Sequence, residues 1–425
     1  MAVITPVKYY NTFVLKKLIQ GDLSAAYNWY VEESRIKGGY NDPQTGLSPR
    51  AFLRSEDNKQ ETLGNSIIYS GVLNSRTGIN QTNQFPSGED ITRSVDPSRG
   101  SIQKLYAEDT NLIIFQENKV NRALIDKDAI FTQEGQPMQT TSNVVIGAIV
   151  PYAGEFGISK NPESFAVYGY RKYFTDANQG AVLRLSQDGI TEISAYGMYD
   201  YFRDRFSTLQ GGEAVGGWDI HNKCYTLSLK SKSENIAVET LSFDEQVQGW
   251  TSRYSYSPKN LNSVQNNFYS TNSGGIFLHN STSVNKATFY GITYSSTVTT
   301  IFNKQPSLIK SFKTINYEGG ANWALTSIST NSGDSANFVN PFVMPITLAD
   351  LENQLFKNEF KKKEDKYFAD LINTTLFAQG EVVFGASVSG IKGYTAKALF
   401  TATNTTTSGT NELFAVSTDY KESSY

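Results

Sequence analysis

The sequence predicts a mainly β fold: an irregular β-propeller-like domain with an additional β-rich platform region and a few helices. The 425-residue chain holds 25 Tyr and 25 Phe, which suit pleated sheets, and its abundant Asn, Ser and Gly suit the turns between strands. Short strand-like runs alternate with tight polar turns, and the starts of these units fall roughly 50 residues apart, as in propeller blades. A β-sandwich gives the same local signals and stays open as an alternative.

The first two predicted regions precede the repeats. Residues 1–64 form a helical or loop segment, because apolar residues from Val14 to Tyr27 recur at nearly helical spacing. Residues 65–100 begin with a strand at Ile67–Leu73 and continue as a polar arm from Asn74 to Gly100. Loops of this length are usually functional or disordered, and one functional hypothesis is an arm that orders against a neighbouring subunit.

The repeats occupy residues 101–335, the predicted propeller-like domain. Each unit reads as strand, tight polar turn, strand, turn and strand. The expected strands of the four units are 112–116, 120–125 and 129–132; then 165–168, 173–175, 181–185 and 190–193; then 216–220, 224–229, 238–243 and 250–254; and finally 267–269, 276–279, 288–294 and 297–302.

The last predicted region, residues 336–425, combines a helix with β-strands. Apolar residues between Thr347 and Leu371 recur at helical spacing. The basic run Lys361–Lys363 inside this stretch is best explained as a solvated helix face rather than a DNA contact. Strands return between Glu381 and Val416.

Composition excludes several classes of protein. With 39% apolar and 19% charged residues, the chain can bury a core and is not a disordered tail. We expect no secretory signal and no membrane-spanning segment, because the longest apolar run, Val144–Val150, is short. The net charge of −3 gives no general basic field for binding nucleic acid, and the single cysteine, Cys224, allows no internal disulfide.

The sequence offers few residues for chemistry. His221 lies near Cys224, but no second pair of ligands follows, so we predict no metal site. The glycine pairs Gly211-Gly212 and Gly274-Gly275 lack the remaining features of nucleotide-binding loops, and no Gly-x-Ser-x-Gly motif occurs. We therefore predict no catalytic residues, no cofactor-binding residues and no cofactor, and the chain is expected not to be an enzyme.

Acids and aromatics leave two alternatives open. A glycoside hydrolase needs two acids across a sugar cleft, and five acids cluster along the chain: Asp176, Asp188, Glu192, Asp200 and Asp204. A turn role is favoured for Asp176 and Asp188, because each stands beside turn residues. Aromatic residues stack sugars or bases in a binding protein, such as a glycan- or receptor-binding protein, but more often fill cores and interfaces; the candidates are Tyr168, Tyr170, Tyr173 and Phe174. The three tryptophans in or near the repeats are interpreted as packing anchors; they are Trp218, Trp250 and Trp323.

Four long stretches together resemble one family of phage tail proteins. Residues 67–120 include IIYSGVLNSRTGINQTNQF and GEDITRSVDPSRGSIQKLYAEDTNLIIFQENKV. Residues 154–204 include GEFGISKNPESFAVYG, YFTDANQGAVLRLSQDGI and GMYDYFRD. KSFKTINYEGG at 310–320 and EVVFGASVSGIKGY at 381–394 complete the set. From about Asn65 onwards the chain resembles the tail muzzle or nozzle proteins of crAss-like phages, relatives of the tail tubular nozzle proteins of other podoviruses.

The resemblance implies a structural role in the virion. Such proteins form a cyclic homo-oligomer, usually a hexamer, below the portal and ring proteins. They enclose the channel through which double-stranded DNA leaves the capsid, without sequence-specific binding. We accordingly expect a virion tail protein assembled in the bacterial cytoplasm. Family members are often much longer, so a fragment, a split-gene product and a compact homologue all stay open.

Overall fold

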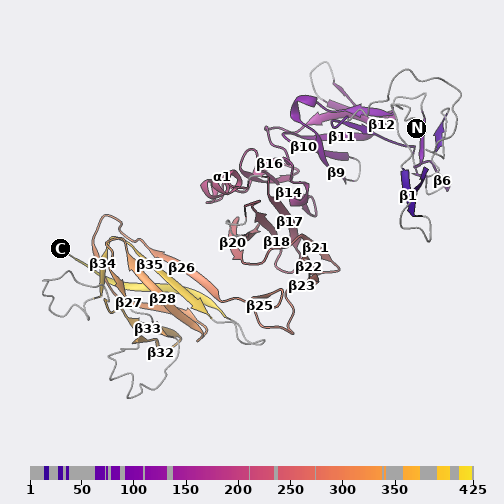
Figure 1. Cartoon of the computed structure of the whole chain (residues 1–425). Coiled ribbons are helices and arrows are strands. Elements are labelled where there is room, and N and C mark those ends of the chain that lie inside the picture. Colours follow the sequence, from indigo (N-terminus) through magenta and orange to yellow (C-terminus); the bar gives the residue numbers. More distant parts are fainter. Residues whose placement is uncertain are drawn as a thin grey trace. The chain divides into compact units, whose positions relative to one another are not determined.

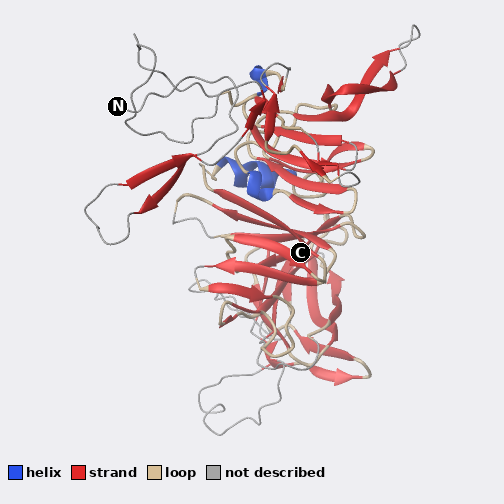
Figure 2. Ribbon diagram, turned by 90° about the vertical axis from the view of Figure 1, so that its right-hand side faces the viewer, coloured by secondary structure: helices blue, strands red, loops and turns tan. Residues whose placement is uncertain are grey.

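The computed structural model describes two compact units, Met1–Ser273 and Gly274–Tyr425 (Figure 1). The described residues are 63–71, 78–85, 91–108, 111–125, 145–209, 211–233, 238–272, 274–336, 360–373, 390–402 and 411–423, together with the strand backbones at 14–18, 27–31, 35–37, 73–74, 86, 126–131, 137–144, 339–340 and 358–359. Strands dominate both units, which confirms the mainly β prediction (Figure 2). Among the described helices, none is long and apolar enough to cross a membrane.

The N-terminal segment is not helical where it is described. β1 (Val14–Leu18) pairs antiparallel with β2 (Tyr27–Val31), and β3 (Arg35–Lys37) pairs parallel with β7 (Gln84–Pro86). The helical prediction for Val14–Tyr27 is therefore wrong at both strands. Aromatic and β-branched residues in Tyr27–Val31 favour a strand, and this preference outweighs a helical spacing that covers few turns.

The predicted arm folds back onto its own unit where it is described. β4 (Ser66–Ile68) pairs antiparallel with β8 (Thr92–Ser94), and β5 (Leu73–Asn74) pairs with β6 (Ile79–Asn80). The 3-10 helix η1 (Pro97–Arg99) follows. The buried Gln116 amide donates to the carbonyl oxygens of Asp96 (2.9 Å) and Gly100 (2.8 Å). Residues 91–100 are thus docked internally, which corrects the expectation of an extended arm in this part.

Three consecutive four-stranded antiparallel sheets form the body of the first unit. Their strands are β9 (Ile102–Glu108), β10 (Asn111–Gln116), β11 (Val120–Phe131) and β12 (Pro137–Pro151); β13 (Ala166–Tyr168), β14 (Arg171–Asp176), β15 (Ala181–Ser186) and β16 (Gly189–Glu192); and β17 (Glu213–Asp219), β18 (Cys224–Lys230), β19 (Glu239–Asp244) and β20 (Gly249–Tyr254). In each sheet the strands pair in sequence order, which is the order of a propeller blade. The closed ring of blades stays a prediction.

Large apolar side chains join neighbouring sheets of this unit. Phe115 of β10 packs edge-on against Phe174 of β14, with ring centroids 5.1 Å apart. The second and third sheets share a core with the helix α1 (Tyr199–Ser207), which buries Phe202 and Phe206. β17 also approaches η2 (Pro162–Ser164) closely, because a Cβ on Gly216 would lie 2.0 Å from the Ser164 carbonyl oxygen. Glycine at this position is therefore required by packing.

Most strands of the second unit form a sandwich of two sheets, whereas β24 and β25 pair with each other in a separate hairpin. One sheet of the sandwich has the order β26-β35-β28-β30-β31, with β29 paired to β28. The other has the order β32-β33-β27-β34, with β36 paired to β27. The strands of this unit are β23 (Gly275–Leu278), β24 (Thr288–Phe289), β25 (Ile292–Thr293), β26 (Ser296–Phe302), β27 (Lys310–Gly319), β28 (Trp323–Thr330), β29 (Ser335–Ala336), β30 (Val339–Asn340), β31 (Asn358–Glu359), β32 (Lys361–Lys363), β33 (Lys366–Asp370), β34 (Ile391–Gly393), β35 (Ala396–Ala402) and β36 (Leu413–Glu422).

The sandwich core draws on both sheets. Tyr317 of β27 lies edge-on to Phe400 of β35, with ring centroids 6.0 Å apart, and both side chains are fully buried. The second sheet also contributes Phe312 and Ile315, and the first contributes Leu325 and Ile328. The sequence analysis placed β26 to β28 in the propeller-like domain 101–335. In the structure, these strands share sheets with strands near the C-terminus.

The predicted helix at Thr347–Leu371 is wrong over its described part, which forms β31, β32 and β33. Here Ala369 and Leu371 are buried on either side of the exposed Asp370, which is the two-residue period of a strand. Glu364 adopts a left-handed conformation (φ 56°) in the turn between β32 and β33. Residues 347–357 of the prediction lie outside the described residues.

Candidate interaction site

Asp176, the first of the five acids, is part of a buried turn. Its Oδ1 accepts hydrogen bonds from Ser159 Oγ (2.7 Å), Asn178 N (3.0 Å) and Gln179 N (3.2 Å), and its Oδ2 accepts one from Gly157 N (2.9 Å). Burial raises the pKa of the Asp176 carboxyl above its ordinary value, although these hydrogen bonds oppose the shift. Both oxygens are thus occupied by the protein, which supports the turn interpretation.

The other four acids have separate local partners. Asp188 is exposed and lies 3.6 Å from the Arg184 guanidinium. Glu192 accepts a 2.7 Å hydrogen bond from Ser194 Oγ. Asp200 and Asp204 are exposed on α1, and both pair with Arg203 between them. The described contacts give no pair of these acids the shared cleft that glycoside hydrolysis needs.

His221 and Cys224 lie in different environments. His221 is exposed in the turn after β17, whereas Cys224 is buried at the start of β18. Burial raises the pKa of the Cys224 thiol to about 11, so it carries the protonated, poorly coordinating form at neutral pH. Among the described residues, no group of three His, Cys, Asp or Glu side chains could hold a metal ion.

A column of aromatic rings joins the second and third sheets. Tyr168 stacks on Trp218 (4.3 Å, 10°), Trp218 on Tyr173 (5.3 Å, 20°), and Tyr173 on Tyr225 (4.9 Å, 14°). The inner three rings are buried, whereas Tyr168 is 40% exposed and Tyr170, in the adjacent turn, is 65% exposed. The buried rings of the column pack the second and third sheets together. At its outer end, Tyr168 and Tyr170 form an exposed aromatic surface.

Glu245 accepts the hydrogen bonds on the polar side of this column. Its carboxylate accepts hydrogen bonds from Tyr173 Oη (2.7 Å) and Arg184 Nη1 (2.9 Å), so it links β14 and β15 to the turn after β19. The side chains of Arg184 and Glu245 are largely buried. Sequence reasoning missed Glu245, since no local pattern distinguishes it from the turn residues around it.

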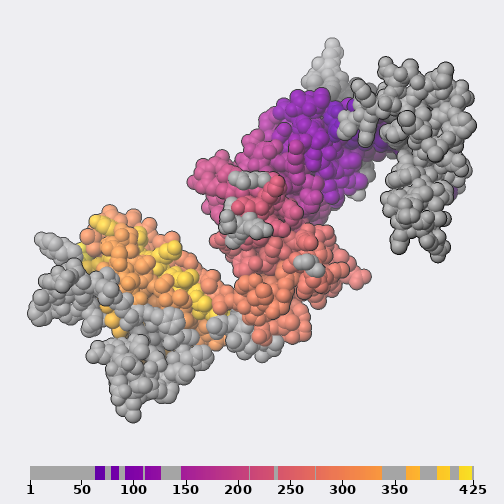
Figure 3. Space-filling model, viewed as in Figure 1, coloured from indigo at the N-terminus to yellow at the C-terminus, as the bar shows by residue number. Residues whose placement is uncertain are grey.

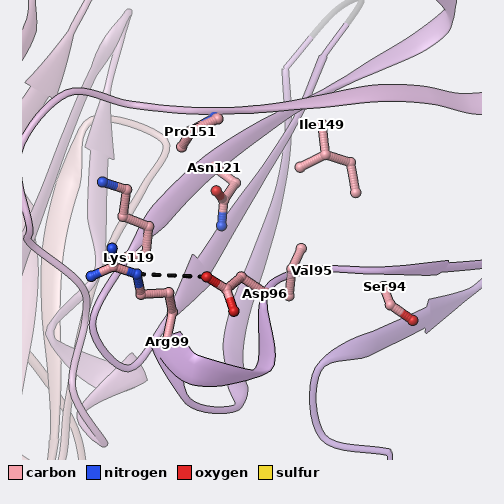
Figure 4. A pocket seen from close by; sticks show the side chains of 8 residues that line it. All are labelled: Ser94, Val95, Asp96, Arg99, Lys119, Asn121, Ile149 and Pro151. Carbon is pink, nitrogen blue, oxygen red and sulfur yellow. Dashed lines mark ion pairs between the residues drawn. The ribbon is translucent and has the colours of Figure 1, made fainter.

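A pocket of about 290 Å³ lies beside η1 in the first unit (Figure 4). Its charged side chains, Asp96, Arg99 and Lys119, gather at one end, and Val95 and Ile149 lie at the other (Figure 4). Lys119 and Arg99 both pair with the Glu155 carboxylate, and Arg99 also pairs with Asp96. These cations are already neutralised, so the pocket has no evident preference for an anion.

The remaining candidates have structural roles. Trp250 Nε1 donates to the Ile193 carbonyl oxygen (3.1 Å), and Trp323 Nε1 donates to that of Glu412 (3.0 Å). The basic run Lys361–Lys363 is exposed, as expected, but it forms the edge strand β32 rather than a helix face. The glycine pairs lead into strands rather than helices: Gly211-Gly212 precedes β17, and Gly275 is the first residue of β23.

These features define a β-sheet protein whose conspicuous polar and aromatic residues hold sheets and turns together. Comparison with known families identifies its class: residues 284–374 match the model of the Crassvirus muzzle protein C-terminal domain. The match confirms the resemblance to crAss-like phage muzzle proteins, so the chain is a structural component of a phage tail.

The other comparisons concern curated proteins and solved structures. No curated protein matches the chain. Two solved structures of an exo-β-1,3-galactanase from Phanerochaete chrysosporium, with β-1,3-galactotriose and with galactose, align at 9% and 10% identity. Each alignment covers 84% of this chain and 99% of the galactanase, with TM-scores of 0.18 and 0.16. Similarity this weak carries no argument about fold or activity.

Proposed function

We propose that this chain assembles with copies of itself, and with ring and portal-proximal proteins, into a ring that forms the DNA-ejection channel of a short-tailed phage. Six copies are the expected number, and assembly takes place in the host cytoplasm. The observation that carries the proposal is the muzzle-domain match at residues 284–374. The sandwich around those residues suits assembly into a ring, because its sheets present edges and flat faces to which neighbouring copies can bind.

We also propose that the chain works without catalysis. The surroundings of the acids support this view: Asp176 is occupied by four donors, and Asp200 and Asp204 pair with one arginine on an exposed helix. An active glycoside hydrolase would need one raised and one ionised acid facing each other across a sugar. Replacing both Asp188 and Glu192 with their amides should leave any activity on host capsule unchanged.

The proposed relation to DNA is passage without binding. A net charge of −3 gives weak attraction to phosphates, and the three consecutive lysines are confined to one sheet edge. A channel wall that attracted DNA strongly would slow its exit. Electrophoretic mobility of double-stranded DNA should therefore be unchanged by the assembled protein at physiological salt.

The deciding experiment is the native mass of the purified protein, measured by light scattering alone and with candidate tail proteins. A closed particle near six copies, formed alone or only with those partners, would support the ring. Projection images of that particle should then contain a central channel. A monomer that ignores every tail partner would refute the assembly proposal.

Glycan binding is a second candidate function, favoured by the exposed end of the aromatic column. Sugars stack on exposed tyrosine rings, and Tyr168 and Tyr170 offer two of them in one hairpin. Calorimetric titration with host surface glycans tests this candidate. Tyr170→Ala should abolish any binding, whereas Tyr199→Ala, another exposed tyrosine, should not alter it. No heat with any glycan would remove this candidate.

A further inference from the structure

In the described part of the second unit, the strand β26 is an open and uncharged sheet edge. On one side it pairs with β35 from Ser296↔Ala402 to Phe302↔Ala396, and no described strand pairs with its other side. Its sequence, STVTTIF, contains no charge and no proline. Val298 and Ile301 are 36% and 67% exposed. Such an edge presents backbone donors and acceptors to any chain that can add a strand.

Two edge strands of the second sheet carry charged side chains. β32 consists of three exposed lysines, Lys361–Lys363, at the edge of the second sheet. β36, at the opposite edge of that sheet, carries Asp419, Lys421 and Glu422 on its last four residues. Lysines and other charges on edge strands normally prevent unwanted strand pairing. The contrast indicates that β26 is left open for a partner.

The first unit contains a strand pair that lacks a third strand. β10 pairs with β11 only as far as Asn111↔Leu124. Beyond that point β11 and β12 continue as a two-stranded ribbon, from Lys127↔Thr141 to Phe131↔Pro137, and no described strand flanks it. Isolated two-stranded ribbons are at best marginally stable in water. All fifteen residues of β12 are uncharged, as are the seven residues of β26.

We infer that β26 of one copy accepts the ribbon strand β12 of a neighbouring copy, around Pro137–Thr141, by β-augmentation. The inference rests on the proposed ring and names the surface that holds its copies together. Because the donor and the acceptor are different surfaces of the same chain, the contact is head-to-tail and can close into a ring. A contact between two β26 strands would instead be two-fold symmetric and would end at a dimer. Figure 3 shows one face of the second unit, where orange residues lie beside yellow residues from the C-terminal end of the sequence.

Two matched lysine variants distinguish a partner strand that pairs with the edge of β26 from a partner that packs on the exposed face of the sheet. Thr299 and Ile301 of β26 are exposed and share cross-strand rows with Leu399 and Lys397 of β35. The same rows continue to the exposed Ser327 and Ser329 of the central strand β28. T299K/I301K should raise the concentration required for half-assembly about tenfold or more, because the lysines guard the edge as they do on β32. S327K/S329K adds the same charge to the same face and should leave assembly unchanged.

Cysteine cross-linking tests the predicted partner directly. Cys224 is 4% exposed, so introduced cysteines are the accessible thiols in the folded protein. T299C should be combined in turn with M138C and T140C and treated with a short bismaleimide. Cross-linked ladders extending to the full ring are expected in at least one combination. T299C alone, M138C alone and T140C alone should give none.

The outcomes distinguish this inference from the ring proposal. A wild-type protein that never assembles refutes the ring. A wild-type ring that survives T299K/I301K, or that is lost equally in S327K/S329K, refutes the open-edge inference and leaves the ring intact. Dimers cross-linked through T299C alone would replace the ribbon with a second β26 as the partner. Circular dichroism of each variant checks that the sandwich is still folded.

Discussion

The buried carboxyl of Asp176 provides the sharpest test of a structural against a catalytic role. In D176N one carboxylate oxygen becomes an amide nitrogen. The orientation that preserves the bonds to Ser159, Asn178 and Gln179 turns that nitrogen toward the Gly157 N–H, which now donates to Oδ2 at 2.9 Å. Two buried donors then face each other.

The expected cost follows from that geometry. A buried donor without a partner costs about 1–3 kcal/mol, and the facing amide adds a similar amount. Removing the buried negative charge offsets part of this loss, because burial already disfavours the ionised carboxyl. We expect D176N to lower the free energy of unfolding by about 2 kcal/mol.

Denaturation with urea, followed by circular dichroism and tryptophan fluorescence, measures this loss in the transition of the first unit. D188N is the matched control, because Asp188 is exposed with a single ion-pair partner, and it should change stability by less than about 0.5 kcal/mol. Equal stabilities for D176N and D188N would refute the argument. Loss of a measurable enzymatic activity in D176N with unchanged stability would refute it more strongly.

The same carboxyl predicts a pH dependence. Its folded-state pKa lies above the ordinary value of 3.8, so the folded state holds the proton more tightly than the unfolded state. The resulting stabilisation is fully present below about pH 3.8 and is lost as pH rises through the folded pKa. The stability advantage of wild type over D176N should therefore be larger in acid than at neutral pH. An advantage that grows with rising pH would contradict the direction of the shift.

Three further predictions concern packing and edges. W218A should destabilise the first unit by about 3–5 kcal/mol because Trp218 is buried between two tyrosine rings, whereas Y170A should have little effect; urea unfolding measures both. Replacing Lys361–Lys363 with serine should remove the guard from β32 and increase concentration-dependent association, which light scattering detects. A chain limited to residues 274–390 should not give a cooperative unfolding transition, because it lacks β35, the strand between β26 and β28.

Local patterns predicted the second and third sheets of the first unit well, whereas β9 and β12 of the first sheet were missed. The strands of the second and third sheets lie within a few residues of their expected positions because each hairpin closes over a short polar turn. The turn role of Asp176 was also predictable, since Asn178 N and Gln179 N are its near neighbours in sequence. Its bonds to Gly157 and Ser159 were not, because they join loops that only the fold brings together.

The second unit was harder to predict because its pairings are distant in sequence. β26 pairs with β35, and Ser296 lies opposite Ala402, so no local signal indicates which strands share a sheet. The helix α1 was missed, although its buried Phe202 and Phe206 have the four-residue spacing of a helix face. Helical spacing was instead assigned to a stretch around Phe368, where two-residue alternation and a tight turn produce a hairpin.

The muzzle-domain match and the sheet topology together clarify what the matched segment contributes. Residues 284–374 include β26, β27 and β28, but β35 and β36, which pair with them, lie beyond the match. The matched stretch therefore supplies the scaffold of both sheets, including the open edge β26 and the lysine edge β32. A tail protein must stay soluble before assembly and then bind its neighbours in one register. Charging β32 while leaving β26 open meets both requirements, because strand addition can then occur at only one of these two edges.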